Sequence, residues 1–114
     1  MIRITVSYPH QGGARFDLDY YTGKHFRLVD QKLRPLGLIG WAADQGLSGL
    51  MPGSDPDFII QAQMVFETLE AAQAALAAEG PALVADIPNF TDIQPRIQIS
   101  NVLIQHVPML AAGA

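Results

Sequence analysis

The chain has 114 residues, a mass of 12.3 kDa and a net charge of −4, which fits one domain with a single hydrophobic core. Because it contains no cysteine, disulfides, thiolate metal sites and cysteine nucleophiles are excluded. The basic residues are interleaved with acidic and apolar ones, and without a basic stripe the chain is not expected to bind nucleic acid.

No apolar run reaches the roughly 18 residues that a membrane helix needs, and the N-terminal residues lack the apolar core of a signal peptide. We therefore expect a soluble, cytoplasmic protein with no membrane partner. Apolar residues make up 49% of the chain and charged residues 16%, a balance at the apolar end of the globular range. This surplus of apolar residues indicates a surface for self-association.

Hydrophobic periodicity predicts the elements of the first half of the chain. Residues 2–8 alternate between apolar and polar, as a half-buried strand does. Asp17 follows as the N-cap of a helix that runs to about Arg34, where Pro35 stops it. A second, irregular strand is predicted over residues 37–47.

The second half continues with a loop, a strand and a helix. The glycine- and proline-rich segment 48–56 predicts a long hairpin loop before a third strand over residues 57–66. Thr68 then caps an alanine-rich helix that closes near Gly80, with Pro81 opening a short further helical piece.

The last strand completes a β-α-β-β-α-β order. It is predicted over residues 93–103, and Pro95 places it at an edge of the sheet because proline lacks an N–H for pairing. This order is that of a ferredoxin-like α+β fold, whose first and third strands are central. We assign residues 1–104 to this domain and expect residues 105–114 to form a flexible tail.

Helical spacing predicts which residues face the sheet. At about 100° per residue, one face of the first helix collects Leu18, Tyr21, His25, Leu28, Val29 and Lys32, with Phe26 and Leu33 at its border. The inner face of the alanine-rich helix is predicted to carry Leu69, Ala72 and Leu76.

Two helices cover only one face of a four-stranded sheet, so the other face must meet water, a ligand or another copy. Its predicted residues are polar but uncharged: Thr5 and Ser7, Gln61 and Gln63, Gln94 and Gln98. This pattern favours a homodimer in which two sheets form a closed barrel, and a plain solvated face is the alternative.

His25 and Tyr21 are the first candidates for chemistry. They lie one turn apart on the same apolar face, so that an imidazole and a phenol come within reach of one another. Such a pair can move protons near neutral pH. The alternative is a core histidine whose ring is satisfied by a backbone carbonyl or by Asp86.

Asp86 and Asn89 follow the second helix and flank the turn at Pro88. Asp86 could orient His25 by a hydrogen bond to the ring nitrogen that does not react. Capping of the turn is the alternative for both residues, and it is the commoner role.

Three further side chains are candidates for substrate binding. Tyr20 points away from Tyr21 and could equally pack at a dimer contact or be a surface tyrosine. Trp41 offers a flat wall for an aromatic ligand, although a lone tryptophan is usually a core residue. Gln94 could line a cavity or simply satisfy backbone groups.

The sequence predicts neither a metal nor a cofactor. The three histidines are far apart and no carboxylate cluster accompanies them. Gly12 and Gly13 follow a strand but lack the rest of a phosphate-binding loop.

Several ordered segments resemble the EthD family of the dimeric α+β barrel superfamily. They are Tyr8-Pro9, the Phe16-Asp17-x-Asp19-Tyr20-Tyr21-x-x-x-His25 helix start, the Gly46-Leu47-Ser48-Gly49 and Pro52-Gly53-Ser54 loop, and the stretch from Asp86 to Pro95. The chain departs from many family patterns at Arg27, where a proline or an equivalent is common.

The resemblance implies a homodimer with a cavity between helices and sheet that binds a small molecule. We expect a cofactor-independent enzyme for a small apolar, oxygenated metabolite, with His25 as general acid or base, Tyr21 positioning the substrate and Asp86 orienting His25. Oxygenation, as in an oxidoreductase of the monooxygenase kind, and isomerisation or cyclisation both stay open. The alternative is a non-catalytic dimeric protein that binds a metabolite.

Overall fold

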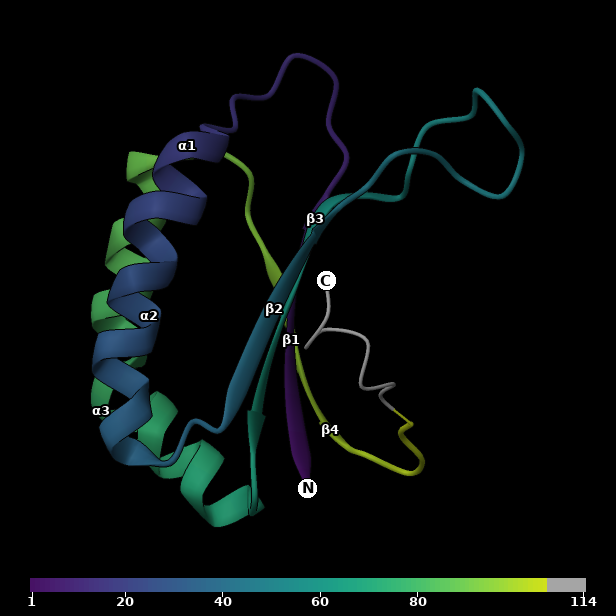
Figure 1. The fold of residues 1–114 in the computed structure, drawn as a ribbon. Coiled ribbons are helices and arrows are strands. Elements are labelled where there is room, and N and C mark those ends of the chain that lie inside the picture. The colour runs from purple at the N-terminus through teal and green to yellow at the C-terminus, as the bar shows by residue number, and fades with distance from the viewer. Residues whose placement is uncertain (107–114) are drawn as a thin grey trace, which may run out of the picture.

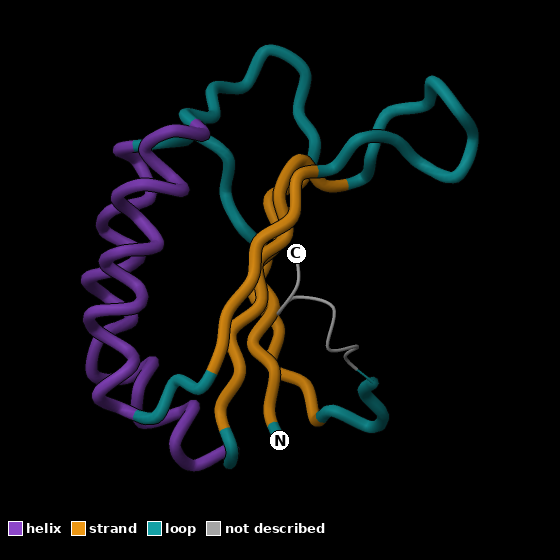
Figure 2. The backbone as a smooth tube through the Cα atoms, in the orientation of Figure 1, coloured by secondary structure: helices purple, strands orange, loops and turns teal. Residues whose placement is uncertain are grey.

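The computed structural model describes residues 1–106, which form a four-stranded sheet with a layer of helices on one face (Figures 1 and 2). The strands are β1 (Ile2–Pro9), β2 (Gly40–Gln45), β3 (Phe58–Phe66) and β4 (Arg96–Asn101). The helical segments are α1 (Leu18–Tyr20), η1 (Tyr21–His25), α2 (Phe26–Leu33), η2 (Arg34–Leu36), α3 (Leu69–Asp86) and η3 (Ile87–Asn89). Of the predicted tail, only Gln105 and His106 lie within the described residues. None of the helices described is long and apolar enough to cross a membrane.

The sheet has the order β2-β3-β1-β4, and all its neighbours are antiparallel. This confirms the predicted ferredoxin-like α+β fold, with β1 and β3 central and β4 at an edge. β2 begins later than predicted because Gly37 closes the preceding turn in a left-handed conformation, with φ at 110°. β4 begins only after Pro95, which has no N–H to pair.

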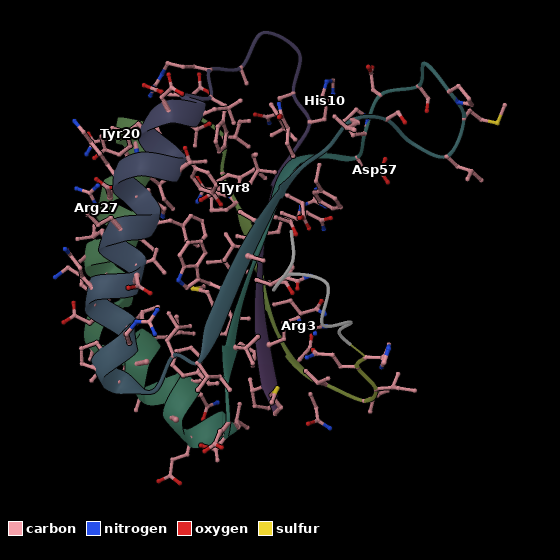
Figure 3. The ribbon with its side chains drawn as sticks, in the orientation of Figure 1. Arg3, Tyr8, His10, Tyr20, Arg27 and Asp57 are labelled. Atoms are coloured by element: carbon pink, nitrogen blue, oxygen red, sulfur yellow. The ribbon has the colours of Figure 1, made fainter. Side chains whose placement is uncertain are left out.

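The pairing register separates the two faces of the sheet, since side chains alternate along each strand. The helix-facing row through Ile4 contains Met64 and Ile99. The next row faces away from the helices and contains Thr5, Gln63, Gln98 and Ala42. In Figure 3, Tyr8 accordingly lies between the two layers, while Arg3 lies on the uncovered side of the sheet.

The first predicted helix forms but contains a π-helical stretch, η1. Asp17 caps it as predicted, its side chain accepting a hydrogen bond from the Tyr20 backbone N–H at 3.0 Å. In η1 the backbone N–H of Phe26 bonds to the carbonyl of Tyr21, a wider turn that shifts every later residue around the helix axis. Phe26 and Leu33 are therefore buried rather than at the border.

α3 runs without interruption from Leu69 to Asp86, so the predicted end near Gly80 and a separate piece from Pro81 are wrong. A proline inside a helix removes one backbone hydrogen bond. Here Ala75 and Leu83, on either side of Pro81, are both buried in the core. This packing holds the helix together through the proline.

The start of α3 matches the predicted cap but not the predicted face. The Thr68 hydroxyl accepts a hydrogen bond from the Ala71 backbone N–H at 3.1 Å. Leu69, predicted to face inward, is 46% exposed, and Ala72 and Ala75 are the buried residues of this half of the helix.

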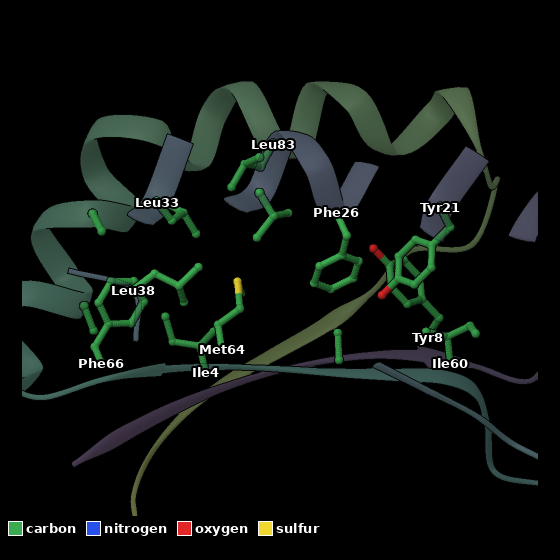
Figure 4. Packing of buried hydrophobic residues seen from close by; sticks show 14 of the residues in the cluster. Ile4, Tyr8, Tyr21, Phe26, Leu33, Leu38, Ile60, Met64, Phe66 and Leu83 are labelled. Atoms are coloured by element: carbon green, nitrogen blue, oxygen red, sulfur yellow. The ribbon is translucent and has the colours of Figure 1, made fainter. Parts of the chain in front are cut away.

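The core fills the space between the helices and the sheet, where Figure 4 shows Leu33 and Leu83 above Ile4 and Met64. The long loop between β2 and β3 projects beyond the sheet, as Figure 2 shows. At its root, a side chain on Gly46 would lie 2.1 Å from the Phe58 carbonyl oxygen, so only glycine fits there.

Candidate functional site

A cavity of about 70 Å³ lies between the helices and the sheet. β1 contributes Tyr8 to its wall, and η1 contributes Tyr21 and His25. Aliphatic and aromatic side chains from α2, α3 and the sheet complete a lining that is almost wholly apolar. The few polar atoms of this wall are therefore the ones that can direct a ligand.

The end of α3 holds His25 in place. The Nδ1 atom of His25 lies 2.9 Å from one carboxylate oxygen of Asp86, and the two side chains are only 8% and 13% exposed. The other Asp86 oxygen accepts hydrogen bonds from the Tyr20 hydroxyl at 2.7 Å and from the Asn89 amide at 2.9 Å. Asp86 thus receives three donors from three different segments.

Asp86 is ionised at neutral pH. Burial by itself would raise the pKa of Asp86, but the hydrogen bonds from Tyr20, His25 and Asn89 outweigh burial and lower it. An ionised carboxylate can only accept hydrogen bonds, so Nδ1 of His25 carries the proton. Whenever the ring is neutral, its Nε2 atom is then a proton acceptor.

Two phenol groups stand beside His25 on the cavity wall. Tyr8 and Tyr21 are each 1% exposed, yet neither hydroxyl has a hydrogen-bond partner among the described residues. In that part of the chain, the only fully enclosed side-chain nitrogen or oxygen without a partner is Nε of Arg3. The hydroxyls of Tyr8 and Tyr21 and Nε2 of His25 must therefore border on space that a water-sized molecule can reach.

The two hydroxyls belong to one local environment. Figure 4 shows the hydroxyl oxygens of Tyr8 and Tyr21 on the side of their rings that faces Phe26. Burial raises the pKa of both groups, and the nearby Tyr8 raises that of Tyr21 further. Both phenols therefore stay neutral near pH 7 and can donate a hydrogen bond to a ligand oxygen.

The π-helical stretch places Tyr21 and His25 together. Their rings are stacked, with centroids 5.6 Å apart and 13° between the planes. The ring of Phe90 packs against His25 from another side at 4.6 Å. Such π-helical turns are frequent at functional sites, and this one fixes the direction of both side chains.

The structure brings some of the predicted site residues together and separates others. His25, Tyr21 and Asp86 form one cluster, and Tyr20 and Asn89 contact Asp86 instead of lining the cavity. Tyr8 also belongs to the cavity wall, although the alternation of its strand predicts only an apolar residue at this position.

Trp41 and Gln94 lie outside this cluster. The indole N–H of Trp41 donates to Asp30 at 2.9 Å, and its ring packs on Phe26 with centroids 4.8 Å apart. Trp41 is 43% exposed and is not among the residues lining the cavity. Gln94 lies in a second hollow beside the cavity. Within residues 1–106, no three His, Asp or Glu side chains are grouped as a metal site would require.

Fold and site together define a ferredoxin-like α+β protein with a mostly apolar cavity between its two layers. The model of the EthD domain matches residues 14–94, and the chain belongs to the EthD family. The sequence resemblance is thereby confirmed at the level of the family.

Individual relatives agree with this assignment. A solved EthD-like protein from Ralstonia eutropha JMP134 is 33% identical, with a TM-score of 0.86 over 92% of this chain and 94% of that one. An EthD family protein from Bacillus halodurans C-125, whose family name refers to ethyl tert-butyl ether, is 20% identical, with a TM-score of 0.69 over 90% and 99% of the two chains. An uncharacterized 11.0 kDa protein from the thcB–thcC intergenic region of Rhodococcus erythropolis is 34% identical over 79% of this chain and 84% of its own.

Proposed function

We propose that this protein is an enzyme that moves a proton on a small, apolar, oxygenated metabolite, with His25 as the general base and acid. One observation carries the proposal. Three polar atoms without partners among the described residues, Nε2 of His25 and the hydroxyls of Tyr8 and Tyr21, border an otherwise apolar cavity. A carbonyl compound would satisfy all three at once.

The step that these groups support is proton abstraction next to a carbonyl. Nε2 of His25 takes the proton, the C–H electron pair moves toward the carbonyl, and the oxygen gains the negative charge. The hydroxyls of Tyr8 and Tyr21 donate hydrogen bonds to that oxygen. Return of the proton from His25 to another carbon completes an isomerisation. In a cyclisation the carbanion attacks a second carbonyl carbon, the π electrons of that carbonyl move to its oxygen, and this oxygen takes the proton from His25. Both outcomes balance without an oxidant or a reductant.

Asp86 would act in this proposal as a positioning residue. Its carboxylate keeps the proton of neutral His25 on Nδ1, so that Nε2 stays the acceptor. Tyr20 and Asn89 hold the carboxylate from its other side. The apolar lining supports a ligand of low polarity, as does the reference to an ether in the name of the Bacillus halodurans relative's family.

We test the proposal by hydrogen exchange in D2O, following deuterium incorporation next to the carbonyl of cyclopentanone, cyclohexanone and acetophenone by NMR. We expect exchange above the buffer rate with the wild type and loss of that excess in His25→Gln. His10→Gln, a change at an exposed histidine, should keep it. Binding of these ketones without any excess exchange would instead support a non-catalytic metabolite-binding protein, and oxidised products would favour oxygenation.

The proposed working form is a homodimer joined through the open face of the sheet. The middle row of that face, Ala42, Gln63, Thr5 and Gln98, carries no charge, and the charged residues Arg3, Asp44 and Arg96 lie in the rows on either side of it. An uncharged centre with charges around it is typical of an interface. We expect light scattering to give twice the chain mass for the wild type and the single-chain mass for Gln63→Arg, because an unpaired charge is costly at a buried interface. A monomeric wild type at about 50 µM, roughly the scale of a weak complex, would contradict this.

A further inference from the structure

A second hollow of about 340 Å³ adjoins the cavity at the β4 edge of the sheet. The two spaces share three wall residues, Val84, Ile87 and Ile97. They are therefore neighbouring compartments, and these three apolar side chains form the boundary between them, which we call the sill. We call the second space the outer groove.

The cavity by itself is small for an organic ligand. Its volume is about 70 Å³, whereas an apolar cavity that holds benzene measures about 150 Å³. A ligand with its oxygen at Tyr8 and Tyr21 must therefore continue beyond the cavity. The outer groove, several times larger, is the adjoining space.

The sill between the compartments is apolar and open to solvent. Val84 on α3 is 54% exposed and Ile97 on β4 is 52% exposed. Ile87, the third shared residue, is also apolar. Apolar side chains from the end of α3 and from the edge strand β4 thus connect the cavity with the outer groove.

Resting on the proposed function, we infer that the ligand spans both compartments. Its oxygen-bearing head lies at Tyr8, Tyr21 and His25, and an unbranched apolar substituent of several carbons crosses the Val84–Ile97 sill into the outer groove. The substrate class is then an oxygenated ring or ketone with an alkyl chain. Gln94, on the wall of the outer groove, contacts the far part of that chain.

The experiment uses phenol, 4-ethylphenol, 4-butylphenol and 4-hexylphenol as probes, with dissociation constants from isothermal titration. We expect affinity for the wild type to rise by about fourfold for each methylene that is buried. Val84 also borders the cavity, so the readout for Val84→Gln is the gain in affinity per methylene and not the affinity for phenol itself. This gain should fall to about twofold or less, because one of the apolar side chains shared by the two spaces is lost.

The matched control is Leu69→Gln. It changes an exposed apolar residue of the same helix, 46% exposed, about 22 Å away along the helix axis. This control should keep the wild-type dependence on chain length. Val84 is itself exposed, so both variants are expected to fold, and their unfolding temperatures check this directly.

The outcomes separate the inference from the proposed function. If phenol binds and is weakened by Tyr8→Phe but chain length has no effect, or if both glutamine variants lose the same amount, the ligand does not cross the sill and only this inference is overturned. If phenol does not bind, or Tyr8→Phe leaves its affinity unchanged, the head-group site is wrong and the proposed function fails with it.

Discussion

Replacing Phe90 by alanine is expected to lower the free energy of unfolding by about 3–5 kcal/mol, the cost of removing a large aromatic side chain from a closed core. Phe90 is 0% exposed. Its ring packs against Phe16, His25 and Tyr21, with centroids 5.3, 4.6 and 5.1 Å away. Since small domains are stable by only about 5–15 kcal/mol, this one change removes a large part of the total.

Urea unfolding followed by tryptophan fluorescence measures the effect, because Trp41 is the only tryptophan of the chain. Phe90→Leu, which keeps most of the volume, should lie between the alanine variant and the wild type. Leu50→Ala, at a residue that is 99% exposed, should not change the midpoint. A Phe90→Ala protein that unfolds at the wild-type urea concentration would show that this aromatic cluster contributes little to stability.

The prediction also concerns the site. The ring of Phe90 packs against both the Tyr20 ring, stacked with centroids 6.2 Å apart, and the His25 ring. A cavity in place of the Phe90 ring would allow Tyr20 and His25, which both donate hydrogen bonds to Asp86, to move. We expect Phe90→Ala to bind phenol more weakly than the wild type even under conditions in which the variant is fully folded.

The order of the elements could be predicted from the sequence because it depends on local signals. Strict alternation marks β1 and β3, and single side chains cap both long helices, Asp17 and Thr68. These interactions involve residues close together in the chain, so a pattern reveals them. The edge position of β4 likewise follows from one proline.

The interior of the helices could not be predicted in the same way. A helical wheel assumes a constant turn, and the π-helical stretch from Tyr21 to His25 breaks that assumption. Likewise, Pro81 reads as a helix start when only its neighbours are considered. In the structure, core packing on both sides of Pro81 keeps α3 continuous through it.

The site was predictable only in part, because its contacts join distant segments. His25 was found from its place in an apolar stripe. Its approach to Asp86, 61 residues away, was one of two alternatives. For Tyr20 the sequence leaves substrate binding, a dimer contact and a plain surface position open, since no local rule shows that its hydroxyl reaches Asp86. Tyr8 was missed because its ring fits the apolar alternation and its hydroxyl has no sequence signature.

Changing Asp86 to asparagine is expected to lower the exchange activity of the proposed enzyme by about 10²–10⁴-fold. The carboxylate accepts three donors, whereas an amide has one acceptor oxygen and an N–H group that must face one of those donors. The amide can donate to Nδ1 of His25 and so move the ring proton to Nε2. His25 then no longer accepts a proton from the ligand.

The same variant has a second, independent readout in the pH dependence of stability. Hydrogen bonds lower the pKa of Asp86 in the folded protein despite its burial, so the unfolded chain takes up the proton at a higher pH than the folded one. This contribution to stability is present above about pH 5 and is lost as the pH falls through the folded pKa. In Asp86→Asn that part of the acid dependence should be absent.

Asp30→Asn provides the control. The hydrogen bonds from Arg34 and Trp41 lower the pKa of Asp30 as well, so this variant should also lose part of the acid dependence. Asp30 does not line the cavity, and exchange activity should stay at the wild-type level. If both variants flatten the acid dependence but neither affects exchange, Asp86 stabilises the fold without positioning His25, and the role of His25 as the base then depends on the His25→Gln result alone.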